Sequence, residues 1–233
     1  MEKLSDNTQT TFEDIRGNYL RICENIEKSG RDVRLMAVTK TVDPARINYA
    51  IGLGISLLGE NRVQEYLDKR DSYKPAEVHF IGGLQTNKVK YIIDKVSMIH
   101  SVDSLRLAEE IDRRAAQHGI IMDILAEINI GGEETKGGVP ADGASVFCSD
   151  VSGFPNIRLR GLMTIPPAGC DESVFADMQE LFERIKVENA HNRENSAFDT
   201  LSMGMSGDYE AAIRHGATIV RIGSGLFGYR KYL

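Results

Sequence analysis

Residues 34–40 read RLMAVTK, a short apolar run that stops at a lysine. A continuous apolar run of this length is typical of a strand buried on both faces in a parallel sheet. Seven similar runs follow along the chain, and the eight predicted strands span residues 33–38, 55–59, 78–82, 98–102, 121–130, 157–165, 198–204 and 217–223. Amphipathic helical stretches separate the runs, and this alternation predicts a parallel sheet with crossover helices.

Eight strand-helix units in 233 residues favour an α/β fold of the (β/α)8 TIM-barrel type, which takes about 250 residues. Three of the helical stretches, 43–54, 103–119 and 171–189, begin with Asp at the expected N-cap. A further helical stretch, roughly residues 8–29, adds an N-terminal helix to the barrel. We find no linker and predict a single domain over residues 1–233. If either the second or the seventh strand were absent, an open doubly wound sheet would be the alternative.

Composition excludes several classes of partner. With 34 acidic and 28 basic residues the formal charge is −6, so the chain has no basic surface that would favour nucleic acid. The polar N-terminus resembles no signal peptide, no apolar run is long enough for a membrane span, and we expect a cytoplasmic protein. The three cysteines and five histidines lack the spacing of metal ligands or of a disulfide framework, so we expect no metal.

Lys40 stands where a barrel enzyme carries its chemistry, just after the first predicted strand. Taken alone, such a lysine is usually a solvated surface charge. A lysine enclosed by the mouth of the barrel can instead form a Schiff base with a carbonyl compound.

The last two strand exits read LSMGMSGDYEAA from Leu201 and RIGSGLFG from Arg221. Barrel enzymes often bind phosphate at these positions, where glycine lets backbone N–H groups approach an anion. Ser206, Gly223 and Ser224 are the candidate phosphate-binding residues, although glycines in such loops usually serve only the turn.

Arg221 interrupts an apolar strand, and a buried guanidinium needs an acceptor. The acceptor is either a carboxylate of a neighbouring strand or a ring nitrogen of a ligand. A lysine, a phosphate cradle and an arginine together suit pyridoxal 5'-phosphate (PLP), with its aldehyde on Lys40 and its ring nitrogen facing Arg221.

Six motifs in order resemble the pyridoxal phosphate homeostasis proteins, single-barrel relatives of the N-terminal domain of alanine racemase. They are LMAVTKT (35–41), GENRVQE (59–65), HFIGGLQTNK (79–88), INIGGEETKGG (128–138), GLMTIPP (161–167) and LSMGMSGDYEAAIRHGATIVRIGSGLFG (201–228). The resemblance implies the barrel of PLP fold type III, a Schiff base between PLP and the Lys40 side chain, phosphate binding at Ser206, Gly223 and Ser224, and Arg221 against the pyridine nitrogen.

The resemblance leaves some residues less defined. Asn61 and His79, expected at the exits of the second and third strands, would bond the ring, line its pocket or serve only the structure. Thr39 and Val78 replace the Ser and Trp that the family more often has, and neither change removes a group needed for imine formation.

The resemblance also implies a role in vitamin B6 and in amino-acid and keto-acid homeostasis, with small amines, amino acids and PLP-dependent apoenzymes as partners of an expected monomer. We expect a carrier without robust catalysis, because racemisation needs acid/base groups on both faces of the substrate and an arginine keeps the pyridine nitrogen unprotonated. A weak amino-acid racemase and a cofactor-free Schiff-base aldolase are the alternatives. Lys136, after the fifth strand, is a candidate relay amine or a solvated loop lysine.

Overall fold

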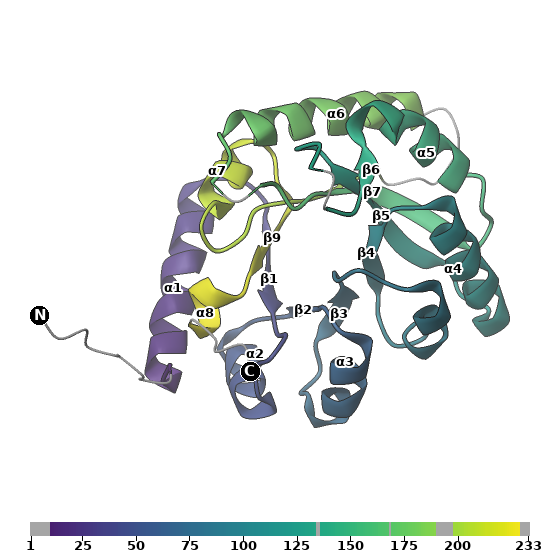
Figure 1. Cartoon of the computed structure of the whole chain (residues 1–233). Helices are drawn as coiled ribbons and strands as arrows, with labels where there is room; N and C mark the ends of the chain where they lie inside the picture. Colours follow the sequence, from purple (N-terminus) through teal and green to yellow (C-terminus); the bar gives the residue numbers. More distant parts are fainter. Residues whose placement is uncertain (1–9, 134–135, 168, 190–197, 229–233) are drawn as a thin grey trace, which may run out of the picture.

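The computed structural model describes residues 10–133, 136–167, 169–189 and 198–228. Eight parallel strands form a barrel around one axis, with helices outside it (Figure 1). The strands are β1 (Arg34–Val38), β2 (Leu57–Glu60), β3 (Glu77–Phe80), β4 (Met98–Val102), β5 (Met122–Asn129), β7 (Ile157–Met163), β8 (Thr200–Ser202) and β9 (Ile219–Ile222). The predicted (β/α)8 barrel is confirmed.

Two pairings decide between a barrel and an open sheet. The first strand lies between β2 and β9, with Met36 opposite both Leu57 and Arg221. The pairing of β4 with β5 closes the ring, with Met98 opposite Asp123. Closure leaves no edge strand in the ring, so the doubly wound alternative is wrong.

Strand residues alternate between the barrel interior and the layer beneath the helices. Met36 and Val38 pack with Leu57, Ile81 and Ile219 in a small buried cluster. Their chain neighbours belong to the larger cluster that the helices cover, as Ala37 and Leu58 do. This alternation decides which side chain after each strand continues the interior row.

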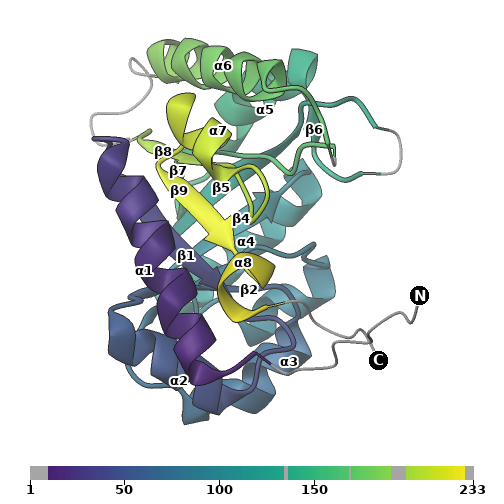
Figure 2. The ribbon, with the colours of Figure 1, turned by 90° about the vertical axis from the view of Figure 1, so that its left-hand side faces the viewer.

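The outer layer consists of helices and short 3-10 turns. They are α1 (Phe12–Lys28), α2 (Pro44–Leu53), α3 (Val63–Lys69), η1 (Arg70–Ser72), η2 (Thr86–Tyr91), α4 (Leu105–His118), η3 (Ala141–Gly143), α5 (Ala144–Val151), α6 (Ser173–Asn189), α7 (Tyr209–Arg214) and α8 (Ser224–Phe227). The predicted N-terminal helix is α1, which runs along the outside of the barrel beside α8 (Figure 2). No helix in these described ranges is both long and apolar enough to cross a bilayer.

Caps explain where several helices begin and end. The Thr11 hydroxyl accepts from the Asp14 N–H and the Asp14 carboxylate accepts from the Thr11 N–H, a capping box that begins α1. Asp43 caps α2 as predicted, and Gly119 ends α4 in the left-handed conformation. The prediction of Asp103 as the N-cap of α4 is wrong, because Ser104 holds that position without a capping hydrogen bond from its side chain.

Two features go beyond the predicted pattern. A two-residue strand, β6 (Val139–Pro140), pairs with the end of β5 and lengthens that side of the barrel rim. Between β3 and β4 the connection is the 3-10 turn η2 in place of a full helix.

Candidate functional site

Lys40 follows β1 by two residues and is half-buried. Met36 and Val38 point into the barrel, and Lys40 comes next in this alternating row, in the turn that directly follows the strand. The lysine therefore stands at the C-terminal mouth of the barrel, where the sequence predicted it.

Thr39, directly before Lys40, is anchored on the outward side of the barrel. Its Oγ1 donates a hydrogen bond of 2.6 Å to Oε1 of the fully buried Glu60, and the Tyr73 hydroxyl donates to the same oxygen at 2.6 Å. Burial raises the pKa of Glu60, although Lys69 and the two hydroxyls oppose the shift. Glu60 went unpredicted, because nothing in the sequence shows that it faces Thr39.

A second anchor holds the loop that follows Lys40. The Lys69 amine donates to the carbonyls of Thr39 at 3.0 Å and of Val42 at 3.3 Å. The Glu65 carboxylate accepts from the Thr41 N–H, and Thr41 has a φ of 59°, which a non-glycine residue adopts only when the surroundings hold it. The turn that carries Lys40 is thus fixed from α3.

Asn61 comes directly after β2 and is half-buried, as predicted for a strand exit. The next loop packs tightly on its backbone, since a Cβ at Gly82 would lie 2.1 Å from the Asn61 carbonyl oxygen. Only glycine at position 82 allows this approach, which fixes Asn61 at the rim.

The two glycine-rich loops meet at the rim between β8 and β9. The Gly225 N–H donates to the Ser206 Oγ at 2.9 Å, and a Cβ at Gly225 would lie 3.1 Å from the Ser206 Cβ. Gly223 lies between β9 and α8, while Ser224 begins α8 and is exposed. The structure therefore brings together the three candidate phosphate-binding residues on one side of the mouth.

Arg221 lies in β9, points into the barrel and is 4% exposed. Its Nη1 donates to the Ser202 carbonyl at 2.7 Å and to the Ser202 Oγ at 2.8 Å, and its Nη2 donates to the Thr164 carbonyl at 2.7 Å. Burial lowers the pKa of Arg221 to about 10, so the guanidinium stays charged at pH 7. These three bonds go to neutral oxygens and use three of its five N–H donors.

Glu127, in β5, is the carboxylate whose charge raises the pKa of Arg221 most, ahead of Asp208. Burial raises the pKa of Glu127 to about 7, with a further contribution from Asp103, while Arg221 opposes the shift. The Glu127 carboxyl therefore changes from neutral to charged near neutral pH, and this charge acts on Arg221. It went unpredicted, although an acid inside the apolar run 121–130, which holds Asp123 and Glu127, was a usable signal.

His79 does not lie at the exit of its strand. It is inside β3, fully buried, and both of its ring nitrogens have partners. Nε2 pairs with Glu77 Oε1 at 2.6 Å, towards the start of the strand, and Nδ1 pairs with His100 Nε2 at 2.9 Å. The expected position at the rim is wrong, because β3 extends one residue beyond His79.

Lys136 lies in the loop that follows β5, on the same face of the barrel as the other strand exits. Its amine donates to the Pro166 carbonyl at 3.2 Å and pairs with Glu133. The side chain therefore links the loop after β5 to the loop after β7.

Comparison with known proteins places this geometry in a family. The family described as alanine racemase, N-terminal domain, matches residues 12–231. A pyridoxal phosphate homeostasis protein of Aquifex aeolicus is 45% identical over 218 residues, which make up 91% of this chain and 93% of that protein. The chain belongs to the pyridoxal phosphate homeostasis protein family. The resemblance inferred from the six motifs is confirmed.

Two solved structures extend the comparison. PipY of Synechococcus elongatus, solved with PLP bound, is similar to this chain with a TM-score of 0.80 and 29% identity, over 92% of this chain and all of that one. Alanine racemase of Corynebacterium glutamicum has a TM-score of 0.72 at 14% identity, over 95% of this chain and 62% of that one. The second likeness concerns the fold alone.

Proposed function

We propose that the protein binds PLP and serves PLP homeostasis, holding the cofactor as a Schiff base on Lys40. One observation carries the proposal: three groups lie at the same end of one barrel. Lys40 follows β1, the Ser206–Gly225 hydrogen bond joins the loops after β8 and β9, and Arg221 lies in β9. The names of the Aquifex aeolicus relative and of the PLP-bound PipY support it.

The residues present fit the chemistry of PLP. Gly225 lacks the Cβ that would crowd Ser206, so the backbone there can approach a phosphate with Ser206, Gly223 and Ser224 around it. Arg221 retains N–H groups for a ring nitrogen, and Lys40 supplies the primary amine. Asn61, at the rim, would contact the ring. When bound, PLP supplies an aldehyde for reversible imine chemistry and a ring that can withdraw electrons.

Arg221 favours a carrier over a racemase. A guanidinium that is charged at pH 7 can only donate hydrogen bonds, so a ring nitrogen that it faces must remain an acceptor without a proton. Such a ring withdraws electrons weakly, which disfavours the loss of a proton from a bound amino acid. We therefore propose that the protein binds PLP reversibly and that small amines and amino acids release the cofactor to apoenzymes. We propose that it does so in the cytoplasm, as a monomer.

Absorbance spectroscopy tests the proposal. Purified protein incubated with PLP should show an imine band in the visible range, and borohydride followed by mass analysis should fix a pyridoxyl phosphate group on Lys40. Lys40→Ala should lose both, whereas Lys90→Ala, at an exposed lysine of η2, should keep both. A protein that stays colourless with PLP would overturn the proposal and favour the cofactor-free aldolase.

A further inference from the structure

Starting at Arg221, a series of polar side chains crosses the otherwise apolar interior of the barrel. The contacts run from Arg221 Nη1 to Ser202 Oγ at 2.8 Å, from Ser202 Oγ to His100 Nδ1 at 3.1 Å, from His100 Nε2 to His79 Nδ1 at 2.9 Å, and from His79 Nε2 to Glu77 Oε1 at 2.6 Å. We call these four links the interior chain. His79, His100 and Ser202 are 0% exposed, so water does not interrupt it.

With one proton on each histidine ring, the end groups set the direction of every link. A guanidinium can only donate, so the Ser202 Oγ accepts from Arg221 and its own proton is free to go to His100 Nδ1. His100 then carries its proton on Nε2 and donates to His79 Nδ1. His79 carries its proton on Nε2 and donates to Glu77, which as a carboxylate can only accept.

The surroundings of His100 and of Glu77 support this arrangement. His100 faces His79, Arg221 and Arg34, and its burial lowers its pKa well below the usual value. Hydrogen bonds from His79 and Arg34 lower the pKa of Glu77 to about 2, which keeps the end of the chain ionised. In the reverse arrangement both ring nitrogens of His79 would carry a proton, because Nε2 donates to Glu77 and Nδ1 would then donate to His100.

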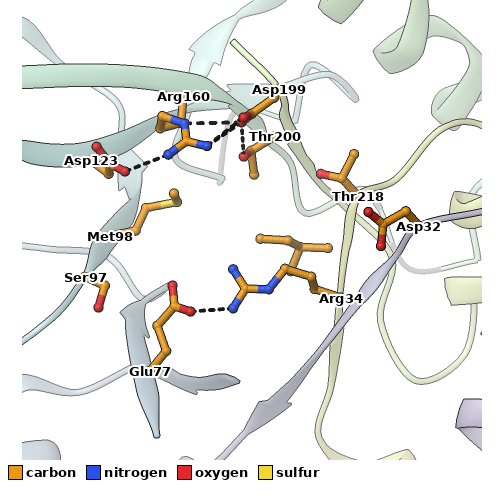
Figure 3. Close-up of a pocket in the computed structure, with 11 residues that line it drawn as sticks. Asp32, Arg34, Glu77, Ser97, Met98, Asp123, Arg160, Asp199, Thr200 and Thr218 are labelled. Atoms are coloured by element: carbon orange, nitrogen blue, oxygen red, sulfur yellow. Dashed lines mark hydrogen bonds and ion pairs between the residues drawn. The ribbon is translucent and has the colours of Figure 1, made fainter. Parts of the chain in front are cut away.

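The far end of the interior chain opens into a cavity at the N-terminal ends of the strands, here called the N-terminal cavity (Figure 3). This cavity has a volume of about 350 Å³ and is lined by charged side chains of several strands. Figure 3 shows Arg34 beside Glu77, and Arg160 beside Asp123 and Asp199. Arg34 donates to Glu77 at 2.5 Å, and Arg160 forms ion pairs with both aspartates. Glu77 therefore belongs both to the interior chain and to the cavity.

We propose that Glu77, His79, His100 and Ser202 are positioning residues that hold Arg221 through a one-directional hydrogen-bond chain, tied at its far end to Arg34 in the N-terminal cavity. The chain gives the Arg221 Nη1 an oriented acceptor in addition to the Ser202 carbonyl, while Nη2 donates to the Thr164 carbonyl. The first three links are buried and the link to Glu77 is partly buried, so a break leaves an unpaired polar atom and releases the neighbouring groups. Only the effect on PLP rests on the proposed function, because the order of protons in the chain does not require a ligand.

Nitrogen-15 NMR of histidine-labelled, PLP-free protein reads this order directly. At pH 7 both His79 and His100 should be neutral with the proton on Nε2 and an unprotonated Nδ1. Ser202→Ala should release His100 and give it a mixture of tautomers. The control His118→Gln, at an exposed position ending α4, should leave both signals unchanged. A proton on His100 Nδ1 in the wild type would overturn the proposal.

A pair of substitutions at the far end tests the coupling to Arg221. Glu77→Met removes the acceptor for His79, whereas Glu77→Gln keeps a carbonyl oxygen there. We expect Glu77→Met and Ser202→Ala to weaken PLP binding about tenfold and to move the visible band, as expected for one lost buried hydrogen bond. Glu77→Gln should stay within about twofold of wild type, as should His118→Gln.

The outcomes separate this inference from the proposed function. Equal PLP affinity and an unmoved band in Glu77→Met and Ser202→Ala would overturn the positioning role. Equal losses in Glu77→Met and Glu77→Gln would also overturn it, because the acceptor would then not matter. If wild type fails to bind PLP while the two histidines show the expected protons, the proposed function fails and the interior chain stands.

Discussion

Thr39 Oγ1 donates to Glu60 Oε1 at 2.6 Å, which ties the residue before Lys40 to the buried end of the neighbouring strand. Tyr73 reaches the same oxygen, so two hydroxyls share one carboxylate oxygen. The backbone position of Lys40 thus depends on the Glu60 carboxylate, which lies on the outward side of the barrel wall.

Thr39→Val should lower the free energy of unfolding by about 1–3 kcal/mol, because it removes the hydroxyl and leaves the buried Glu60 with one donor fewer. It should also slow imine formation at Lys40, since the turn loses the Thr39–Glu60 hydrogen bond, one of its two anchors. Urea denaturation and the rate of appearance of the visible band measure the two effects. Thr39→Ser keeps the hydroxyl and should behave like wild type; a matching loss in Thr39→Ser would show that the methyl group matters instead.

Gly225→Ala should weaken PLP binding about tenfold. The new Cβ would lie 3.1 Å from the Ser206 Cβ and would push apart the two loops that form the proposed phosphate site. Gly207→Ala is the matched control in the same pair of loops, since a Cβ there meets nothing within 4 Å. Equilibrium titration with PLP, read by absorbance, compares the two variants. Similar affinities in both would place the phosphate elsewhere.

Much of this arrangement was predictable from local sequence, and the rest was not. Lys40 and Arg221 were found because charges that end or interrupt apolar strands stand out in one dimension. Their supports were missed because Glu60 reaches Thr39 across strands and His100 reaches His79 from 21 positions away. The position of His79 in the interior was missed for a related reason. Its role follows from Glu77, two residues before it in β3, and from His100, which the register of β3 and β4 brings to it.

Glu127→Gln should make the protein more stable above neutral pH and leave it unchanged in acid. Glu127 has a folded pKa of about 7, above its ordinary value of 4.5, so the stability that its protonated form contributes is complete below pH 4.5 and is lost as the pH rises through 7. The variant cannot lose a proton and should exceed wild type by about 1–3 kcal/mol at pH 8.

Urea denaturation of both proteins between pH 4.5 and pH 8 measures this difference. Glu109→Gln, on the exposed side of α4, is the control and should follow wild type at every pH. A difference between Glu127→Gln and wild type that does not grow with pH would show that Glu127 titrates at its ordinary pKa.

If the Lys136 amine forms an imine with PLP during release, Lys136→Ala should slow the release of PLP to an acceptor apoenzyme. Equilibrium binding should stay unchanged. The amine now bonds the Pro166 carbonyl and pairs with Glu133, contacts that it must exchange to act in this way. Stopped-flow transfer to an apoenzyme, together with a PLP titration, measures both quantities.

Lys136→Arg separates relay from support at this position. Arginine keeps the positive charge and can reach the same carbonyl and carboxylate, but as a guanidinium it cannot form an imine with PLP. Slow release in both variants would support an amine relay, whereas normal release in Lys136→Arg would mean that Lys136 only joins the loops after β5 and β7. Wild-type release in Lys136→Ala would exclude both roles, because the side chain would then contribute nothing to the path of the cofactor.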